Sequence, residues 1–482
     1  MENKDLINLA LKDVNGAWNK SFITTANCYV IKRCGRYCLP LVYGNALVNG
    51  EANPKAYTRK GKEENTQPFY DAYNKEITQP WIEGCVSGEV VGNDSPEDYV
   101  IDNIKVMEDG RYMEFEVTKF PELGGNAILA VKDKEGNVLW SWHLWAYADE
   151  IVDINGFMNV NLGWKWYDSE KKSGYNPHYQ WGRKDPMLEN CNICNAATNS
   201  FGEAIQKPGT FFCYESGNYN WVTVDGKSVN YYNYWNADCD GEDLMDLEVV
   251  KTVYDPCPVG FSIPKGDAFK GFNEDDGGEW EGGFTWNRRY FPAAGSRGRT
   301  SGSIYYVGSG GYYWSSAAFS RTGVYDLGFN STSVGPRGTN GRAYGFSVVP
   351  VLGPRLSPEY TDLSTRSLNG DSRPLRENDN VIREDKDIAI TEDIFVKNGW
   401  YVAKTANGIF YQATLNYPCY RTKPFWQINI NKDNMMSVYS SCYNGDNDHL
   451  EKLAYKKVET MADIKNVLRF CELNEIANSI VS

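Results

Sequence analysis

The sequence predicts a mainly β protein with minor α content, divided into several domains. Aromatic residues make up 14% of the chain, and 45 glycines supply many turn positions. Long stretches rich in Leu and Ala, which are typical of helical bundles, are scarce. At 482 residues the chain exceeds one ordinary core of about 100 to 200 residues, so we expect three or four domains.

Residues 1–20 predict an amino-terminal arm or short helix. Leu6, Leu9, Ala10 and Leu11 form a brief helical pattern. The segment is otherwise polar, lacks the apolar core of a secretory signal and begins with an initiating methionine. We therefore expect a protein that is made and assembled in a cytoplasm. A mature chain whose signal has been removed is the alternative.

Residues 21–153 predict a β-sandwich of the Ig-like kind. Met113, Phe115 and Val117 alternate with polar neighbours, as a strand with one buried face does. After a turn, every second residue of 138–144 is large and apolar. Such a large apolar face must be buried, and packing against a second sheet would bury it.

Residues 154–352 predict a second domain with short strands and long irregular connections. Trp, Tyr, Gly and Asn dominate its composition. Turn signals run from Tyr175-Asn176-Pro177 to Gly308-Ser309-Gly310-Gly311. We expect a domain that is stabilised by an aromatic core more than by regular strand ladders.

The end of the chain predicts a linker and a small third domain. Residues 353–393 are polar and charged, as an extended arm is. Residues 394–482 contain strand patterns near 400–402, 409–415 and 426–430. A capping pattern from Thr460 is followed by apolar residues at helical spacing, which predicts a small α+β domain with a terminal helix.

The region from Tyr254 to Pro350 carries a family resemblance. Five blocks occur there in order: Asp255-Pro256-Cys257-Pro258-Val259-Gly260-Phe261, Ile263-Pro264, Phe291-Pro292-Ala293-Ala294-Gly295-Ser296-Arg297, Gly311-Tyr312-Tyr313-Trp314-Ser315-Ser316 and Tyr344-Gly345-Phe346-Ser347-Val348-Val349. The series resembles the Fibrobacter succinogenes major paralogous domain, and residues 161–187, with Gln180-Trp181-Gly182-Arg183-Lys184-Asp185-Pro186, are similar to its upstream half. That domain is similar to the C-type-lectin-like fold of diversity-generating retroelement target proteins. The resemblance implies β-ribbons that support long loops, and a display surface on the final strands.

The amino-terminal region carries a second resemblance. Three blocks support it: Thr25-Ala26-Asn27-Cys28-Tyr29-Val30, Pro40-Leu41-Val42-Tyr43-Gly44-Asn45-Ala46 and Leu139-Trp140-Ser141-Trp142-His143-Leu144-Trp145. They resemble the amino-terminal module of fimbrillin-like surface proteins from gut anaerobes and of related phage proteins. This resemblance implies no particular activity.

The segment from 317 to 340 is the predicted ligand-contact surface, because the lectin-like resemblance implies variable binding positions there. Its aromatic, charged and amide side chains on a glycine-rich scaffold suit contact with a target. The predicted contact residues are Ala317, Phe319, Arg321, Tyr325, Asp326, Asn330, Thr332, Arg337 and Asn340. The alternative is that they are ordinary loop and strand residues.

The large aromatic residues elsewhere are expected to fill cores. This applies to Tyr312, Tyr313, Trp314, Trp140, Trp142 and Trp145, since large aromatic side chains usually supply burial. Stacking on sugar rings is the alternative for these residues. We therefore place a platform for sugar rings at Phe319 or Tyr325.

Metal ions and cofactors are not expected. Asn236, Asp238 and Asp240 resemble the start of a calcium loop, which leaves calcium there as an alternative. Leu247, however, stands at the twelfth position, where such a loop needs a bidentate Glu. The Cys191 and Cys194 pair has no second pair nearby, so buried free thiols are expected, with zinc or a local disulfide as alternatives.

Catalysis and nucleic-acid binding are also not expected. The chain has three histidines, His143, His178 and His449, and none adjoins a recognisable nucleophile motif. A glycosidase with two separated carboxylates stays open. The net charge of −14 disfavours binding of nucleic acid. The chain contains no run of about 18 apolar residues, so no membrane span is predicted.

These observations predict a non-enzymatic binding or adhesion protein. With the two resemblances, they favour a phage virion fibre or receptor-binding protein that forms a homo-oligomer. It would contact a polysaccharide or protein of the host cell surface, and other virion or surface-assembly proteins. A structural virion decoration or connector protein and a bacterial cell-surface adhesin, similar to a fimbrial tip, are the alternatives.

Overall fold

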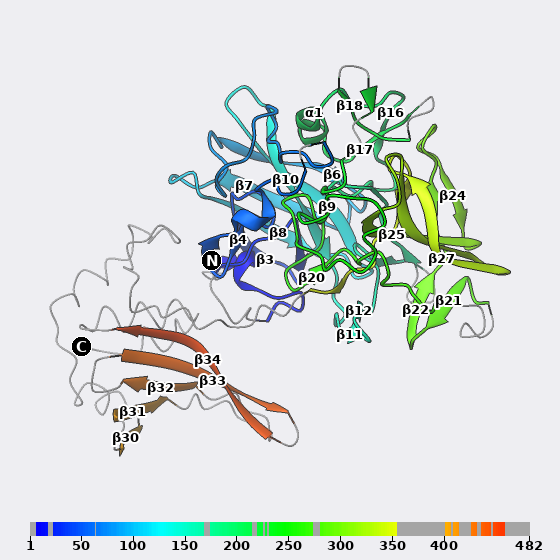
Figure 1. Ribbon diagram of the computed structural model, residues 1–482. Helices are drawn as coiled ribbons and strands as arrows, with labels where there is room; N and C mark the ends of the chain where they lie inside the picture. Colours follow the sequence, from blue (N-terminus) through cyan, green and yellow to red (C-terminus); the bar gives the residue numbers. More distant parts are fainter. Residues whose placement is uncertain are drawn as a thin grey trace. The chain divides into compact units, whose positions relative to one another are not determined.

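The protein is mainly β, as the sequence predicted (Figure 1). The computed structural model divides the chain into two compact units, residues 1–357 and 358–482. Side chains are described for most of residues 6–353, and only strand backbone is described beyond. The described ranges are 6–17, 23–62, 64–167, 174–214, 219–224, 227–228, 231–272, 280–353, 401–405, 408–413, 426–430, 435–444 and 447–457.

Residues 6–146 contain two four-stranded sheets that share one core. The first has the order β1 (Leu6–Asn8), β3 (Gly35–Pro40), β8 (Tyr112–Lys119) and β7 (Val100–Val106). The second has the order β2 (Cys28–Ile31), β10 (Val138–Ala146), β9 (Gly125–Lys132) and β6 (Ser87–Asn93). The sheets approach closely at Gly88, where a Cβ would lie 2.3 Å from Met113 Sδ. A side chain at Gly88 would therefore push the sheets apart.

The pattern of burial in β8 and β10 explains the position of this core. Met113, Phe115 and Val117 of β8 are fully buried, as their alternation predicted. In β10, however, all nine residues are buried, including Ser141 and His143. Both faces of β10 are therefore covered, one by the first sheet and the other by residues that follow 153.

Residues 6–11 do not form the predicted helix. They form β1 and the single 3-10 turn η1 (Leu9–Leu11), and Asn8 caps that turn by accepting from Ala10 N. All three residues of η1 are buried, whereas a surface helix keeps one face polar. The parallel pairing of β1 with β3 supplies the backbone hydrogen bonds that a helix would have supplied internally.

The second half of the first unit is built around a larger sheet. Its order is β15 (Tyr179–Gln180), β28 (Gly345–Phe346), β23 (Ala294–Arg297), β25 (Gly310–Ala318), β26 (Gly323–Asn330) and β27 (Ser333–Gly341), and β24 (Ile304–Val307) also pairs with β23. A smaller sheet has the order β11 (Asp153–Ile154), β12 (Phe157–Met158), β29 (Val351–Leu352) and β20 (Phe261–Ser262). The smaller sheet holds the beginning and the end of this half together.

Short elements complete the first unit. One α-helix lies within the described residues, α1 (Phe201–Gln206), and Ser200 caps its amino terminus. The other elements are β4 (Leu47–Val48), β5 (Glu51–Ala52), η2 (Pro54–Ala56), β13 (Lys165–Trp166), β14 (Gly174–Tyr175), β16 (Asn192–Cys194), β17 (Thr210–Phe212), β18 (Thr223–Val224), β19 (Lys227–Ser228), β21 (Gly283–Trp286) and β22 (Arg289–Pro292).

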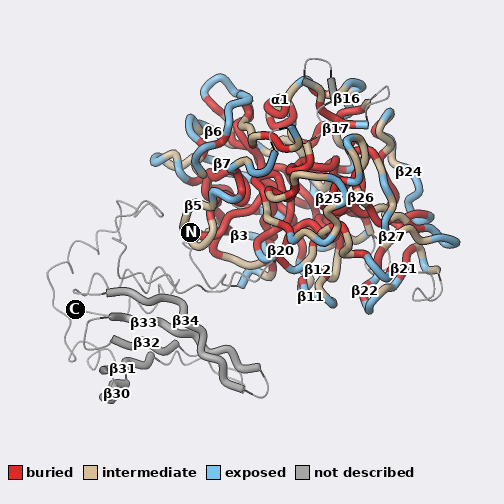
Figure 2. Tube along the Cα trace, in the orientation of Figure 1, coloured by how far each residue is buried: buried red, intermediate tan, exposed pale blue. Residues whose placement is uncertain are grey.

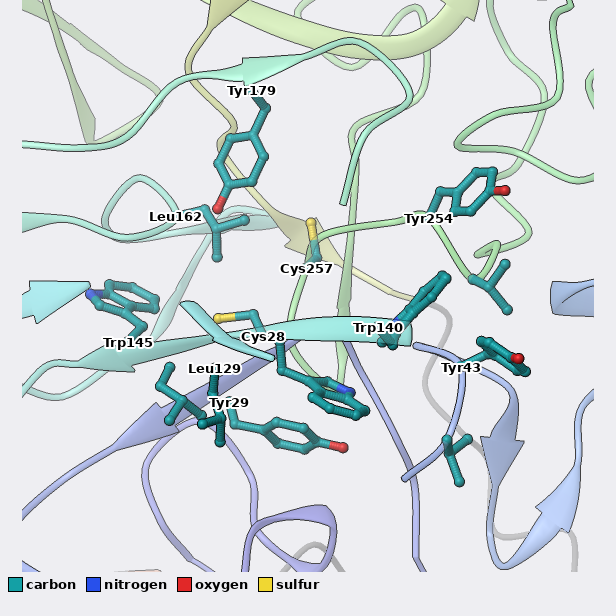
Figure 3. Close-up of a cluster of buried hydrophobic side chains, with 14 of the residues drawn as sticks. Cys28, Tyr29, Tyr43, Leu129, Trp140, Trp145, Leu162, Tyr179, Tyr254 and Cys257 are labelled. Carbon is teal, nitrogen blue, oxygen red and sulfur yellow. The ribbon is translucent and has the colours of Figure 1, made fainter. Parts of the chain in front are cut away.

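The core continues across the predicted boundary at residue 153, as the buried residues in Figure 2 indicate. Figure 3 shows part of it, with Cys28, Tyr29, Leu129, Trp140 and Trp145 from the amino-terminal sheets and Leu162, Tyr179, Tyr254 and Cys257 from the second half. Asn27 donates to the carbonyl oxygens of Val253 and Asp255 at 2.6 and 2.8 Å. The predicted domain boundary stays a prediction, but packing and hydrogen bonds join the two sides of it.

The second unit contains a five-stranded antiparallel sheet. Its strands follow chain order: β30 (Tyr401–Thr405), β31 (Gly408–Ala413), β32 (Trp426–Ile430), β33 (Met435–Asn444) and β34 (Asn447–Lys457). The first three coincide closely with the strand patterns in the sequence. The predicted terminal helix lies outside the described residues, as does the linker after residue 353.

Candidate functional site

The predicted contact residues lie on the meander β25–β26–β27, but they do not form one patch. Phe319 and Arg321 lie in the turn between β25 and β26. Asn330 and Thr332 lie at the turn between β26 and β27. These turns are separated by the eight residues of β26, or about 27 Å at roughly 3.4 Å per residue. A compact ligand would contact only one of the two ends.

A cluster at the turn between β25 and β26, which we call the hairpin tip, consists of the exposed Phe319 and Arg321 and the half-buried Tyr325 of β26. The ring of Phe319 is 43% exposed and packs edge-on against Tyr325, with 5.4 Å between centroids. The Tyr325 hydroxyl donates to Asp243, and Arg321 is exposed. The hairpin tip thus offers an aromatic face, a cation and a carboxylate to solvent.

Arg342 holds the hairpin tip from beneath. This fully buried guanidinium donates through Nη1 to the carbonyl of Arg321 and through Nη2 to that of Ser320, at 2.5 and 3.3 Å. It also lies over the Trp181 ring at 5.1 Å. Burial lowers the pKa of Arg342, yet an arginine keeps its charge at neutral pH. No sequence signal indicates this role, because Arg342 is a single basic residue twenty positions after the turn.

Two predicted contact residues are buried and need correction. Ala317 is 3% exposed and packs beside Gly266, where a Cβ would lie 2.7 Å from its own Cβ. Asp326 is 1% exposed, and its Oδ1 accepts from Asn340 Nδ2 at 3.0 Å. These residues shape the sheet and are not available for direct contact in this conformation.

The second oxygen of Asp326 has no hydrogen-bond partner among the described residues. It lies against Gly338 of β27, where a Cβ would approach it to 2.9 Å. Burial therefore raises the pKa of Asp326 to about 7. Arg337 is exposed and Asn340 is half-buried, so β27 itself presents a mixed polar edge.

The aromatic residues expected in cores are buried with one exception. Tyr313, Trp314, Trp140, Trp142 and Trp145 have no exposed surface. Tyr312 is half-buried and lies on the face of the sheet opposite to Tyr325. Its partial exposure was missed because Tyr312, Tyr313 and Trp314 are consecutive, and the sequence alone does not show which face is covered.

The calcium candidates are engaged in other interactions. Asp238 forms an ion pair with Lys60 at 2.6 Å, and Asn236 Oδ1 accepts from the backbone nitrogens of Asp238 and Val250. The side chain of Asp240 packs against Gly61. Across the described residues, no three side chains of His, Cys, Asp or Glu are grouped as metal ligands would be. Cys191 and Cys194 are not joined by a disulfide and are free thiols.

Polar groups that resemble catalytic sets are enclosed in the protein. Lys184 Nζ lies 2.6 Å from both Ser141 Oγ and Asp185 Oδ1, and burial lowers the pKa of Lys184 to about 8. These three side chains are at most 4% exposed. His143 contacts Asn126 and Tyr179, and burial lowers its pKa to about 3. Such enclosed groups join the two halves of the unit.

Comparison of the chain with protein-family models, with curated proteins and with solved structures found no match. In the part of the chain that the structure describes, no helix has the length and apolar character needed to cross a membrane. The fold identifies the chain as a mainly β protein, and the two turns of its meander carry exposed residues.

Proposed function

We propose that this chain is a non-enzymatic binding protein that contacts a host-surface glycan or protein through the hairpin tip. The observation that carries the proposal is the turn held by Arg342, whose buried guanidinium fixes two backbone carbonyls. A turn fixed before binding loses little conformational entropy when a target is bound. Phe319, Arg321 and Tyr325 add the aromatic and charged groups that dominate contact energies. A role as a phage virion fibre or receptor-binding protein, acting outside the cell, combines these features with the sequence resemblances.

The test compares binding of the purified chain and two variants to intact gut anaerobes and to polysaccharide extracted from each strain. The first variant changes Phe319, Arg321 and Tyr325 to Ala. The matched control changes Asn330 and Thr332 to Ala at the opposite turn. We expect the triple variant, with an unchanged near-UV circular dichroism spectrum, to lose binding while the control retains it. Equal binding by all three proteins, or none by the wild type, refutes the proposal.

A structural role in a virion is the second candidate, and the sheet of the second unit favours it. Among the described strands, β30 and β34 each pair with a single neighbour. Unpaired strand edges are templates for pairing with another chain. Light scattering tests this candidate, since a chain that serves as a connector should form a defined oligomer that is lost when residues 358–482 are removed.

A further inference from the structure

A group of partly exposed tyrosines lies at the meander and the neighbouring strand β24, and its member Tyr312 is on the face of the meander opposite to Tyr325. We call it the tyrosine arc and define it as Tyr219, Tyr305, Tyr306, Tyr312 and Tyr344. Tyr312 of β25 pairs with Gly328 of β26, and residues that pair directly share a face. Tyr325 is three positions from Gly328 and faces the other way. Tyr312 and Tyr325 therefore lie on opposite faces of the meander.

The rings of the tyrosine arc follow one another at close spacing. Tyr305 and Tyr306 of β24 are 47% and 60% exposed, with 6.2 Å between ring centroids. Tyr306 and Tyr312 are 6.1 Å apart. The buried ring of Phe346 then joins Tyr312 to Tyr344, at 5.1 and 5.7 Å. The result is a row of neighbouring rings in which Tyr305 and Tyr306 are exposed and Tyr312 and Tyr344 are half-buried.

Backbone strain at two positions favours a role for these rings. Tyr306 and Tyr219 have positive φ angles of 65° and 53°. A bulky residue is an outlier in this region, which Gly, Asn and Asp occupy far more readily, and strain of this kind concentrates at functional sites. In a regular strand Tyr305 and Tyr306 would point to opposite faces. The left-handed residue breaks that alternation, so both rings lie in one row.

Arg299 closes one end of the row. Its guanidinium lies 4.6 Å from the centre of the Tyr219 ring, and its Nε donates to the Tyr344 hydroxyl at 3.3 Å. The cation holds both rings in place and keeps part of its charge near the surface. Gly341 permits the contact from below, since a Cβ there would lie 2.5 Å from Tyr219 Cβ.

We propose that the tyrosine arc is a second binding site and that it takes a neutral polysaccharide chain. A tyrosine presents an apolar ring face together with a hydroxyl group, and a pyranose presents an apolar C–H face together with hydroxyls. A row of rings suits successive sugars of one chain. The net charge of −14 disfavours an acidic polysaccharide, which leaves neutral chains as the class of ligand.

The experiment is affinity electrophoresis of the full chain in native gels that contain dextran, xylan, yeast mannan or hydroxyethylcellulose. We expect at least one polysaccharide to retard the wild type. The double variant Tyr305→Ala with Tyr306→Ala should bind that polysaccharide at least about tenfold more weakly, and Tyr73→Ala, which removes an exposed tyrosine from the amino-terminal half, should bind it as the wild type does. Tyr306→Gly removes one ring and relieves the strained backbone, so it keeps the test valid if the double variant does not fold.

Two outcomes overturn the proposal: no retardation of the wild type by any of the four polysaccharides, or equal retardation of wild type, double variant and Tyr306→Gly. The triple variant of the hairpin tip separates this site from the proposed function. It should lose binding to cells and keep its retardation by the polysaccharide, because none of its three changed residues belongs to the tyrosine arc.

Discussion

Replacing Asp326 with Asn should stabilise the protein at neutral and alkaline pH but not in acid. Because burial raises the pKa of Asp326 from 3.8 to about 7, the folded state holds a proton that the unfolded state releases between these values. The free energy of unfolding therefore falls as pH rises through this window. A shift of about three pKa units corresponds to roughly 4 kcal/mol. The side-chain oxygen of the new amide would still accept from Asn340, but its NH2 group would lie against Gly338 without a partner. The expected gain in the free energy of unfolding is therefore smaller, roughly 1 to 3 kcal/mol at pH 8.

Urea denaturation followed by tryptophan fluorescence measures this prediction, because Trp314 is buried beside Asp326 in the paired strand. Wild type and Asp326→Asn are compared at pH 4.5 and pH 8, values that lie on either side of the folded pKa. The matched control is Asp102→Asn, whose carboxylate is exposed and whose removal should change little at either pH. A difference between Asp326→Asn and wild type that is the same at both pH values would refute the assignment of an uncompensated buried carboxylate.

Three further perturbations follow from the same contacts. Lys184→Met should lower the free energy of unfolding by about 3 to 5 kcal/mol, because Asp185 is left charged and buried; adding Asp185→Asn should restore much of it in urea denaturation. Arg342→Lys keeps the charge but loses the two guanidinium hydrogen bonds to the carbonyls of Arg321 and Ser320. The turn should then open more often, so that hydrogen exchange at the Gly323 amide becomes about tenfold faster. Tyr306→Gly should raise the free energy of unfolding by up to about 1 kcal/mol, seen as a higher melting temperature.

Much of the amino-terminal half could be predicted from the sequence, because its strands alternate. Met113, Phe115 and Val117 face the core as expected. The burial of Ser141 could not be predicted, since its partners Lys184 and Asp185 lie more than 40 positions along the chain. From sequence alone, a polar residue within an apolar strand is expected to face solvent. Ser141 is buried because a charged pair from a distant part of the chain binds its hydroxyl group.

The contact surface was harder to predict, because two irregularities change which side chains share a face. The pairing of β25 with β26 shifts between Trp314 and Ala318, and that of β26 with β27 shifts between Asp326 and Gly328. A bulge of this kind turns the following residues to the other face of the sheet. The buried position of Asp326 therefore could not be distinguished from the exposed position of Arg337 by counting along the sequence.

The same irregularities explain how one small sheet presents two surfaces. A flat meander would place its side chains in two regular rows, and the core would take one row entirely. Here the left-handed Tyr306 of β24 places its ring 6.1 Å from that of Tyr312, next to the buried rings of Trp314 and Phe346. At the turn between β25 and β26, the buried Arg342 guanidinium holds the carbonyl of Arg321. Hydrogen bonds join the meander's half to the amino-terminal half, from Asn27 to the Val253 carbonyl and from Lys184 to the Ser141 carbonyl of β10. The amino-terminal half therefore packs against and supports the half that carries both surfaces.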